Sequence, residues 1–134
     1  MIKGIAHTAF IVEDMEASLH FYCNVLGLEH AFNVQKDNGE PWIEYVKAAP
    51  RQYIELFHGG TPSSGRSPDE AGPHHLCLLV DDVEKTAEQL KSRGVDLDTE
   101  PKRGIGKNTQ CWLRDPDGNK IELLAPDPAS PHNQ

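Results

Sequence analysis

The tripeptide Ile54-Glu55-Leu56 occurs a second time as Ile121-Glu122-Leu123, and each copy closes one half of the chain. Each half also opens with a histidine in a strand-like segment, His7 in the first half and His75 in the second. The two histidines are 68 positions apart and the two glutamates 67. A repeat that carries histidine and glutamate at matching places predicts that four side chains meet to bind a divalent metal ion.

Length and charge narrow the class of protein. The chain has 134 residues, which fits one compact domain or two small modules that share a core. The net charge of -8 is spread along the sequence, which argues against nucleic acid and anionic membranes as partners because both require a basic surface. No apolar run is long enough to cross a bilayer, and no signal peptide is expected. The three cysteines have no metal-like spacing and are interpreted as free thiols in a reducing cytoplasm.

The first module, residues 1–57, predicts the order strand, helix and three strands. Strands are expected over 5–12, 28–35, 42–48 and 52–57, with a helix over 15–26. Asp14 is the expected N-cap of that helix and Gly27 its C-terminal residue. Glu55 lies within an apolar strand, where an unpaired carboxylate in a dry core costs several kcal/mol. It is therefore expected either to face water or to have a cation.

The second module, residues 75–125, repeats the same order. Strands are expected over 75–80, 95–99, 109–114 and 120–124, with a helix between Asp81-Asp82 and Gly94. The bridge, residues 58–74, is rich in glycine, proline and serine and is interpreted as a flexible connection. The tail, residues 126–134, is rich in proline and is predicted to be disordered.

Each module is therefore a four-stranded sheet covered by one helix, which leaves one face of the sheet open. We expect the open faces of the two sheets to bury each other, so that the two histidines and two glutamates converge between them. Other candidates have plainer interpretations. The histidines without a repeat partner, His20, His30, His58 and His132, are interpreted as surface groups. His74 is expected on the face opposite His75, and Cys77 is interpreted as a small buried thiol.

These features resemble the vicinal-oxygen-chelate superfamily, which includes glyoxalase I, methylmalonyl-CoA epimerase, fosfomycin- and bleomycin-resistance proteins and extradiol dioxygenases. The matching segments cover nearly the whole chain except the bridge and the tail; they are residues 7–14, 21–28, 54–56, 75–82 and 115–123. The resemblance implies an α+β fold of two tandem βαβββ modules, with metal ligands on the first and last strands of each. Carried over position by position, the ligands are His7, Glu55, His75 and Glu122.

This ligand set is most similar to that of glyoxalase I. Extradiol dioxygenases and fosfomycin-resistance enzymes use two histidines and one glutamate, and bleomycin-resistance proteins usually lack the set. The resemblance implies a cytoplasmic metal-dependent lyase or isomerase in which Glu122 or Glu55 takes a proton next to a metal-bound oxygen, giving an enediolate. One divalent metal ion per site is expected, either nickel, zinc, cobalt, manganese or iron, and the residues do not distinguish among these.

The substrate-binding residues depart from the glyoxalase I pattern. Ile11 occupies a position where an arginine is typical, and Phe57-His58-Gly59-Gly60 replaces a segment that usually contains Asn-Trp. Two elements of the glutathione site are therefore absent, and the resemblance does not support glutathione specificity. Lys107 and Arg103 belong to a basic loop before the last hairpin and are predicted to bind an anionic group of a small-molecule substrate.

Two other functions remain open. One is an epimerase or thiol transferase of the same superfamily, although the epimerases commonly have glutamine at the position of Glu55. The other is a non-catalytic resistance protein that sequesters a ligand between two subunits. The superfamily also implies a homodimer, in which each metal site is built within one chain or shared by two.

Overall fold

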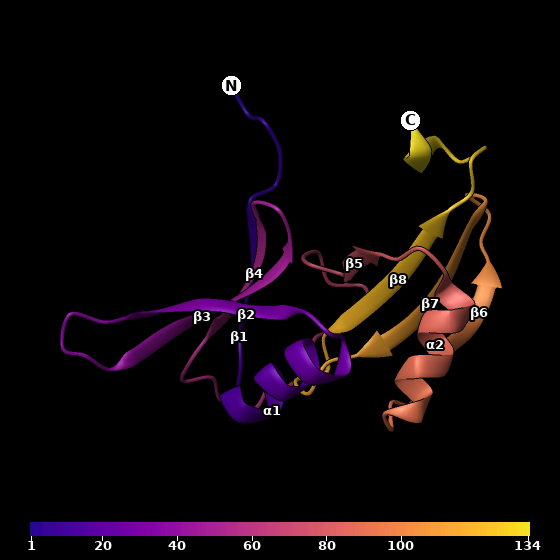
Figure 1. The fold of residues 1–134 in the computed structure, drawn as a ribbon. Coiled ribbons are helices and arrows are strands. Elements are labelled where there is room, and N and C mark those ends of the chain that lie inside the picture. Colours follow the sequence, from indigo (N-terminus) through magenta and orange to yellow (C-terminus); the bar gives the residue numbers. More distant parts are fainter. The chain divides into compact units, whose positions relative to one another are not determined.

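The computed structural model describes residues 1–134, and the chain divides into two compact units, Met1–Gly65 and Arg66–Gln134. Each unit contains one four-stranded sheet and one helical segment between its first and second strands (Figure 1). This arrangement confirms the predicted α+β fold of two βαβββ repeats. The boundary between the units lies within the segment that the sequence predicts as a bridge.

The sheet of the first unit has the strand order β1-β4-β3-β2. Its strands are β1 (His7–Ile11), β2 (Glu29–Gln35), β3 (Pro41–Ala49) and β4 (Gln52–Phe57). Strand β1 runs parallel to β4, and the other neighbours are antiparallel. Figure 1 shows the tip of the β2–β3 hairpin extending away from the other two strands.

The predicted helix of the first unit is correct in extent but changes its winding midway. Helix α1 (Met15–Leu19) is capped by Asp14, whose side chain accepts a hydrogen bond from a backbone N–H of the first turn. It continues as the π-helix η1 (His20–Val25), after which the Leu26 N–H donates to the Phe21 carbonyl five residues back.

The sheet of the second unit has the matching order β5-β8-β7-β6. Its elements are β5 (Leu76–Leu79), α2 (Val83–Ser92), β6 (Thr99–Arg103), β7 (Asn108–Arg114) and β8 (Lys120–Pro126). Helix α2 contacts β6, β7 and β8 and buries Val83, Ala87 and Leu90. The apolar residues spaced by four and three thus form the core face of this helix.

Two predictions about the second unit are wrong. Strand β6 begins at Thr99, where the predicted strand ends, so part of the predicted basic loop is strand; Pro101 is tolerated there because β6 is an edge strand. The tail is not disordered throughout, because it contains the 3₁₀ helix η2 (Pro131–Asn133). Ser130 is fully buried and its hydroxyl accepts a hydrogen bond from the His132 N–H at 3.2 Å.

Alternation along the last strand of each unit separates core from site. The residues that flank the two glutamates, Ile54, Leu56, Ile121 and Leu123, are at most 2% exposed. The glutamates point to the opposite face of each sheet because successive strand residues alternate.

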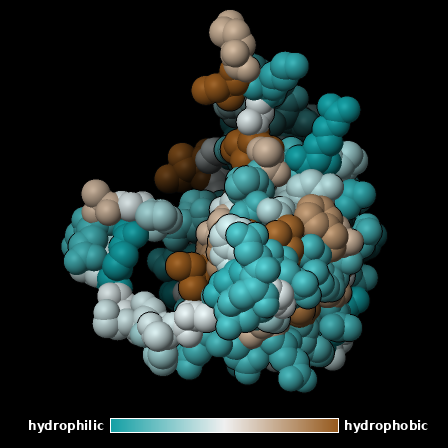
Figure 2. Space-filling view, turned by 90° about the vertical axis from the view of Figure 1, so that its left-hand side faces the viewer, coloured by the Kyte–Doolittle hydropathy of each residue, from teal (hydrophilic) through white to brown (hydrophobic).

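No helix of the chain is both long and apolar enough to span a bilayer. On the surface shown in Figure 2, hydrophilic residues predominate and hydrophobic residues form small separate groups.

Candidate functional site

In the first unit, His7 and Glu55 are in contact on one face of the sheet. His7 begins β1 and Glu55 lies on the parallel neighbour β4, with Ala9 opposite Glu55 in the register. Nδ1 of His7 is 3.4 Å from Oε1 of Glu55. The glutamate is only 7% exposed, whereas the His7 side chain is 51% exposed. A buried carboxylate therefore faces an accessible imidazole.

The second unit contains the same pair at the equivalent place. His75 directly precedes β5, and its Nε2 is 3.0 Å from Oε2 of Glu122 on β8. Glu122 is also 7% exposed. In each unit the structure thus brings together the histidine and the glutamate that the sequence singles out.

His74 belongs to this site, contrary to the prediction that it lies on the opposite face from His75. Nδ1 of His74 is 2.7 Å from Nδ1 of His75, so one ring nitrogen donates to the other. Strand β5 begins only at Leu76, and the alternation of a strand does not apply to the two residues before it. The contact orients the His75 ring and leaves its Nε2 facing Glu122.

The neighbours of the two glutamates form one row across each sheet. In the first unit the row contains Ala9, Glu55, Tyr45 and Phe32. In the second unit it contains Cys77, Glu122, Trp112 and Thr99. The two rows match position by position, so the internal repeat extends from the glutamates to the residues around them.

Each glutamate has one hydrogen-bond donor in its row, but the donors differ. The Tyr45 hydroxyl donates to Glu55, and burial followed by this contact with the carboxylate raises the pKa of Tyr45. The Cys77 thiol donates to Glu122, and burial followed by the Glu122 charge raises the pKa of Cys77 to about 12. Cys77 as a whole residue is exposed rather than buried as predicted, but its thiol is partly desolvated beside Glu122, and the raised pKa keeps the thiol protonated.

The donor chemistry fits a divalent metal ion. The only ion-pair contact of each buried glutamate is with its histidine. Two neutral imidazoles and two carboxylates would balance the charge of such an ion, and mixed nitrogen and oxygen donors suit first-row transition metals. The donors occur in pairs, however, and the structure contains no group of three or more His, Cys, Asp or Glu side chains arranged to hold a metal ion.

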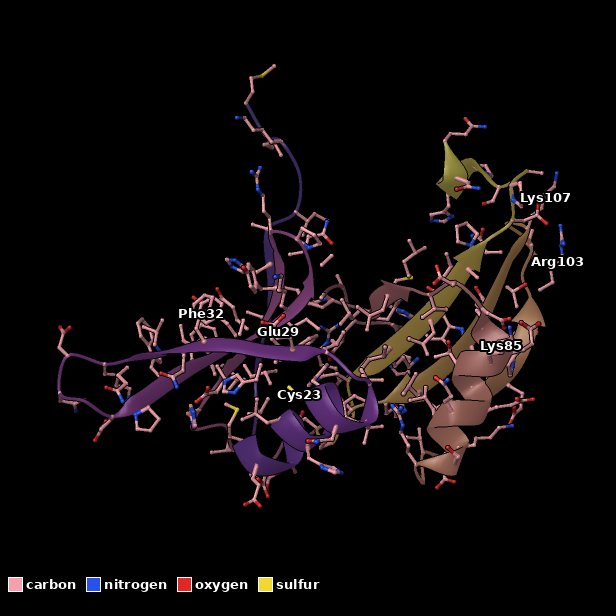
Figure 3. All side chains as sticks on the ribbon, viewed as in Figure 1. Cys23, Glu29, Phe32, Lys85, Arg103 and Lys107 are labelled. Atoms are coloured by element: carbon pink, nitrogen blue, oxygen red, sulfur yellow. The ribbon has the colours of Figure 1, made fainter.

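Arg103 and Lys107 lie away from the glutamate row of the second unit. Arg103 pairs with Thr109, which is three residues from Trp112 along β7, or about 10 Å at the rise of a strand. Its guanidinium binds Asp127 at 3.0 Å, and Lys107 follows in the β6–β7 turn. Figure 3 shows both side chains at the end of this hairpin, pointing outward. Their role in binding an anionic substrate group stays a prediction.

Two of the histidines without a repeat partner bind a carboxylate; His30 is exposed, as predicted, whereas His58 is half-buried. Nε2 of His30 is 2.6 Å from Oε2 of Glu44, and Nε2 of His58 is 3.1 Å from Oε1 of the same residue. Glu44 is opposite Leu56 in the register and therefore lies on the face away from Glu55. Each histidine is 14 positions from Glu44, so no short motif in the sequence reveals this cluster.

The segment that replaces Asn-Trp after β4 folds closely against the end of β1. The Gly60 N–H donates to the Val12 carbonyl at 3.0 Å. A Cβ at Gly60 would lie 2.6 Å from that carbonyl oxygen, closer than van der Waals contact permits. The glycine is therefore required by close backbone packing, and Ile11 beside it is 69% exposed.

Comparison with known proteins agrees with the geometry. Residues 4–123 match the Glyoxalase/Bleomycin resistance protein/Dioxygenase superfamily. The chain is 30% identical to a lactoylglutathione lyase of Salmonella typhimurium, covering 90% of each chain. It is 26% identical to a 2-epi-5-epi-valiolone epimerase of Actinomyces sp., covering 98% of this chain and 84% of the relative.

Among solved structures, the antibiotic-binding protein TnmS3 from Streptomyces sp. CB03234 is similar with a TM-score of 0.72 and 25% identity. The similarity covers 94% of this chain and 98% of that protein. The sequence match, the repeated βαβββ units and the paired histidines and glutamates are all consistent with one another. The chain belongs to the glyoxalase/bleomycin resistance protein/dioxygenase superfamily.

Proposed function

We propose that the protein is a divalent-metal-dependent lyase or isomerase of the glyoxalase I type. The observation that carries this proposal is the repetition of one buried glutamate in contact with one histidine in each unit. A buried carboxylate is unfavourable without a cation, and a partly exposed histidine is a weak substitute for one. The same unfavourable arrangement in both units is explained by a shared ligand role.

The proposed metal ligands are His7, Glu55, His75 and Glu122. Two donors are too few for a stable protein site, so the proposal requires both histidine–glutamate pairs. When bound, the metal would supply Lewis acidity, which makes the carbon next to a substrate carbonyl more acidic. Nickel, zinc, cobalt, manganese and iron all suit this donor set.

Glu122 is the proposed general base. A thiol is a weak hydrogen-bond donor and a phenol a strong one, so Cys77 restrains Glu122 less than Tyr45 restrains Glu55. The freer Glu122 carboxylate takes a proton from the carbon next to the substrate carbonyl and, as a carboxylic acid, returns it to the neighbouring carbon. Glu55, held by Tyr45, serves as the fixed ligand.

The test combines metal analysis with turnover. The purified protein should contain about one equivalent of a transition metal per site and should convert the hemithioacetal of methylglyoxal, offered with glutathione and with simpler thiols. Glu122→Gln should lower kcat by about 10² to 10⁴-fold, because a positioned general base contributes on that order. Glu29→Gln is the matched control, because it makes the same chemical change at a residue that lies exposed on β2 (Figure 3).

The Tyr45→Phe variant distinguishes the roles proposed for Glu55 and Glu122. If Glu122 is the base and Glu55 a fixed ligand, losing the Tyr45 hydrogen bond should weaken metal binding while kcat of the metal-loaded enzyme changes little. Unchanged turnover in Glu122→Gln would contradict the assignment of the base. A purified protein that contains no metal, and whose turnover does not change when metal is added, would contradict the metal site itself.

An epimerase is the second candidate, favoured by the similarity to 2-epi-5-epi-valiolone epimerase. It would use the same proton transfer but return the proton to the same carbon. Incorporation of solvent deuterium at that carbon, without isomerisation of a hemithioacetal, would favour it. A ligand-sequestering role, suggested by the similarity to TnmS3, would show as tight binding of an intact ligand without turnover.

We further propose that the protein works as a homodimer in a reducing cytoplasm. All three cysteines are free, which suits a reducing compartment. Analytical ultracentrifugation of the metal-loaded protein tests the dimer, with a sedimenting mass of twice the 14.9 kDa chain expected.

A further inference from the structure

A small cavity opens beside the glutamate row of the second unit. It has a volume of about 250 Å³ and is lined by His74, Asp98, Thr99, Trp112, Arg114 and Lys120. Trp112 is opposite Glu122 in the register, and its ring lies 4.7 Å from the His75 ring. The cavity therefore adjoins the histidine–glutamate pair of this unit.

The equivalent place in the first unit is filled by aromatic rings. Tyr45 holds the position that Trp112 holds in the second unit, and Phe32 and Tyr53 lie beside it. Phe32 stacks on Tyr45 with ring centroids 4.2 Å apart, and the Tyr53 ring is 6.1 Å from that of Tyr45. These three rings occupy the positions that correspond to the cavity lining in the second unit.

The second unit lacks two of these three rings. Thr99 is opposite Trp112 just as Phe32 is opposite Tyr45. Lys120 lies two residues before Glu122, as Tyr53 does before Glu55, and is opposite Arg114. The substitutions at these two positions therefore open the cavity and place an ammonium group at its wall.

Lys120 is the uncommitted cation of the cavity. The Arg114 guanidinium donates to Asp98 at 2.7 Å and to the Gly118 carbonyl at 3.0 Å. The Lys120 ammonium group forms no ion pair or side-chain hydrogen bond, although the residue is half-buried. A lysine without a partner at the wall of a cavity is a favourable place for an anion.

We propose that this cavity is a subsite for the carboxylate end of the substrate, bound by Lys120 with its carbon chain against the Trp112 indole. The proposal rests on the proposed function, because it places the subsite next to Glu122. A monoanionic carboxylate fits better than a phosphate dianion, since only one cation is free and the Asp98 carboxylate lies at the wall. The substrate class is then a small oxo or hydroxy acid.

The test uses metal-free protein, so that it depends on neither metal nor turnover. The chain has two tryptophans, and Trp42→Phe leaves Trp112 as the single indole reporter. This variant is titrated with propionate and with propionamide, its neutral isostere, at constant ionic strength. Propionate should change the Trp112 fluorescence saturably, and propionamide should not do so over the same concentrations.

Further substitutions in the same background locate the binding. Lys120→Met should weaken propionate binding about tenfold, the effect of removing one charge-assisted hydrogen bond. Lys85→Met is the matched control with the same change of net charge, because Lys85 lies on α2 with its side chain 81% exposed (Figure 3). Thr99→Phe should fill the cavity and abolish binding.

Equal binding of propionate and propionamide would overturn the subsite, and so would undiminished binding in Lys120→Met that retains the circular dichroism of the parent. Propionate binding by a protein that takes up no metal and shows no turnover in the separate tests of the proposed function would support the subsite while contradicting that function. Metal-dependent turnover of a substrate that carries a carboxylate, unaffected by Lys120→Met, would do the reverse. The two failures are therefore distinguishable.

Discussion

The two units present the same histidine–glutamate pair and surround it with different side chains. On the glutamate face, the first unit has Tyr45 as hydrogen-bond donor, whereas the second has Cys77 as donor and an open cavity over Trp112. The repeat thus keeps the residues that can bind a metal and varies those that can bind a substrate. A repeated site becomes asymmetric through its neighbours, and the proposed division of roles between Glu55 and Glu122 depends on this asymmetry.

The opposite faces of the two sheets differ in the same manner. Glu44 is opposite Leu56 in the first unit, and Cys111 is opposite Leu123 in the second, so the two residues are equivalent. Glu44 has two histidine partners, and Cys111 is fully buried among apolar residues. One unit therefore keeps a polar cluster where the other keeps an ordinary core.

The largest expected effect tests what the two units share. Leu56→Ala and Leu123→Ala each remove a side chain that is at most 2% exposed, beside a glutamate on the core face. Each should lower the free energy of unfolding by about 2–5 kcal/mol, through lost transfer free energy and a residual cavity. Urea denaturation followed by circular dichroism measures both. A loss below about 1 kcal/mol in only one variant would show that the two cores are not equivalent.

An intermediate effect tests the polar cluster of the first unit. Glu44→Cys introduces the residue of the second unit and leaves His30 and His58 without their acceptor. The free energy of unfolding should fall by about 1–3 kcal/mol, towards the lower value because the His30 side chain is 41% exposed and can bind water. Chemical denaturation at pH 7 provides the measurement.

The matched variant completes the exchange between units. Adding His30→Leu and His58→Ala to Glu44→Cys gives the residues found 67 positions later in the second unit. Most of the lost stability should return, because replacing a whole polar cluster by apolar residues is often neutral whereas breaking it is not. A triple variant less stable than the single one would mean that the histidines contribute by packing rather than by binding Glu44.

Sequence patterns predicted the features that depend on local periodicity. The repeat and the order of strands and helix along each unit follow from alternation within strands and from the spacing of 67 to 68 positions. The expected meeting of two histidines and two glutamates is seen only as one pair within each unit. The partners of Glu44, the contact of His74 with His75 and the donors Tyr45 and Cys77 did not follow. They depend on cross-strand register and on the exact start of a strand, which alternation within one segment does not determine.

The smallest effect concerns the thiol that replaces the polar cluster. Burial, followed by the negative charges of Glu100 and Glu84, raises the pKa of Cys111 to about 11 from its ordinary value of 9.0. The folded state thus disfavours the thiolate, so this contribution to stability is complete below about pH 9 and is lost as the pH rises through 11. Between pH 8 and pH 10 the free energy of unfolding of the wild-type protein should fall by about 1 kcal/mol more than that of Cys111→Ala. Urea denaturation of both proteins across this range measures the difference. If the free energies of unfolding of the two proteins changed in parallel with pH, Cys111 would have the same pKa in the folded and unfolded states. Burial of Cys111 would then not disfavour its thiolate.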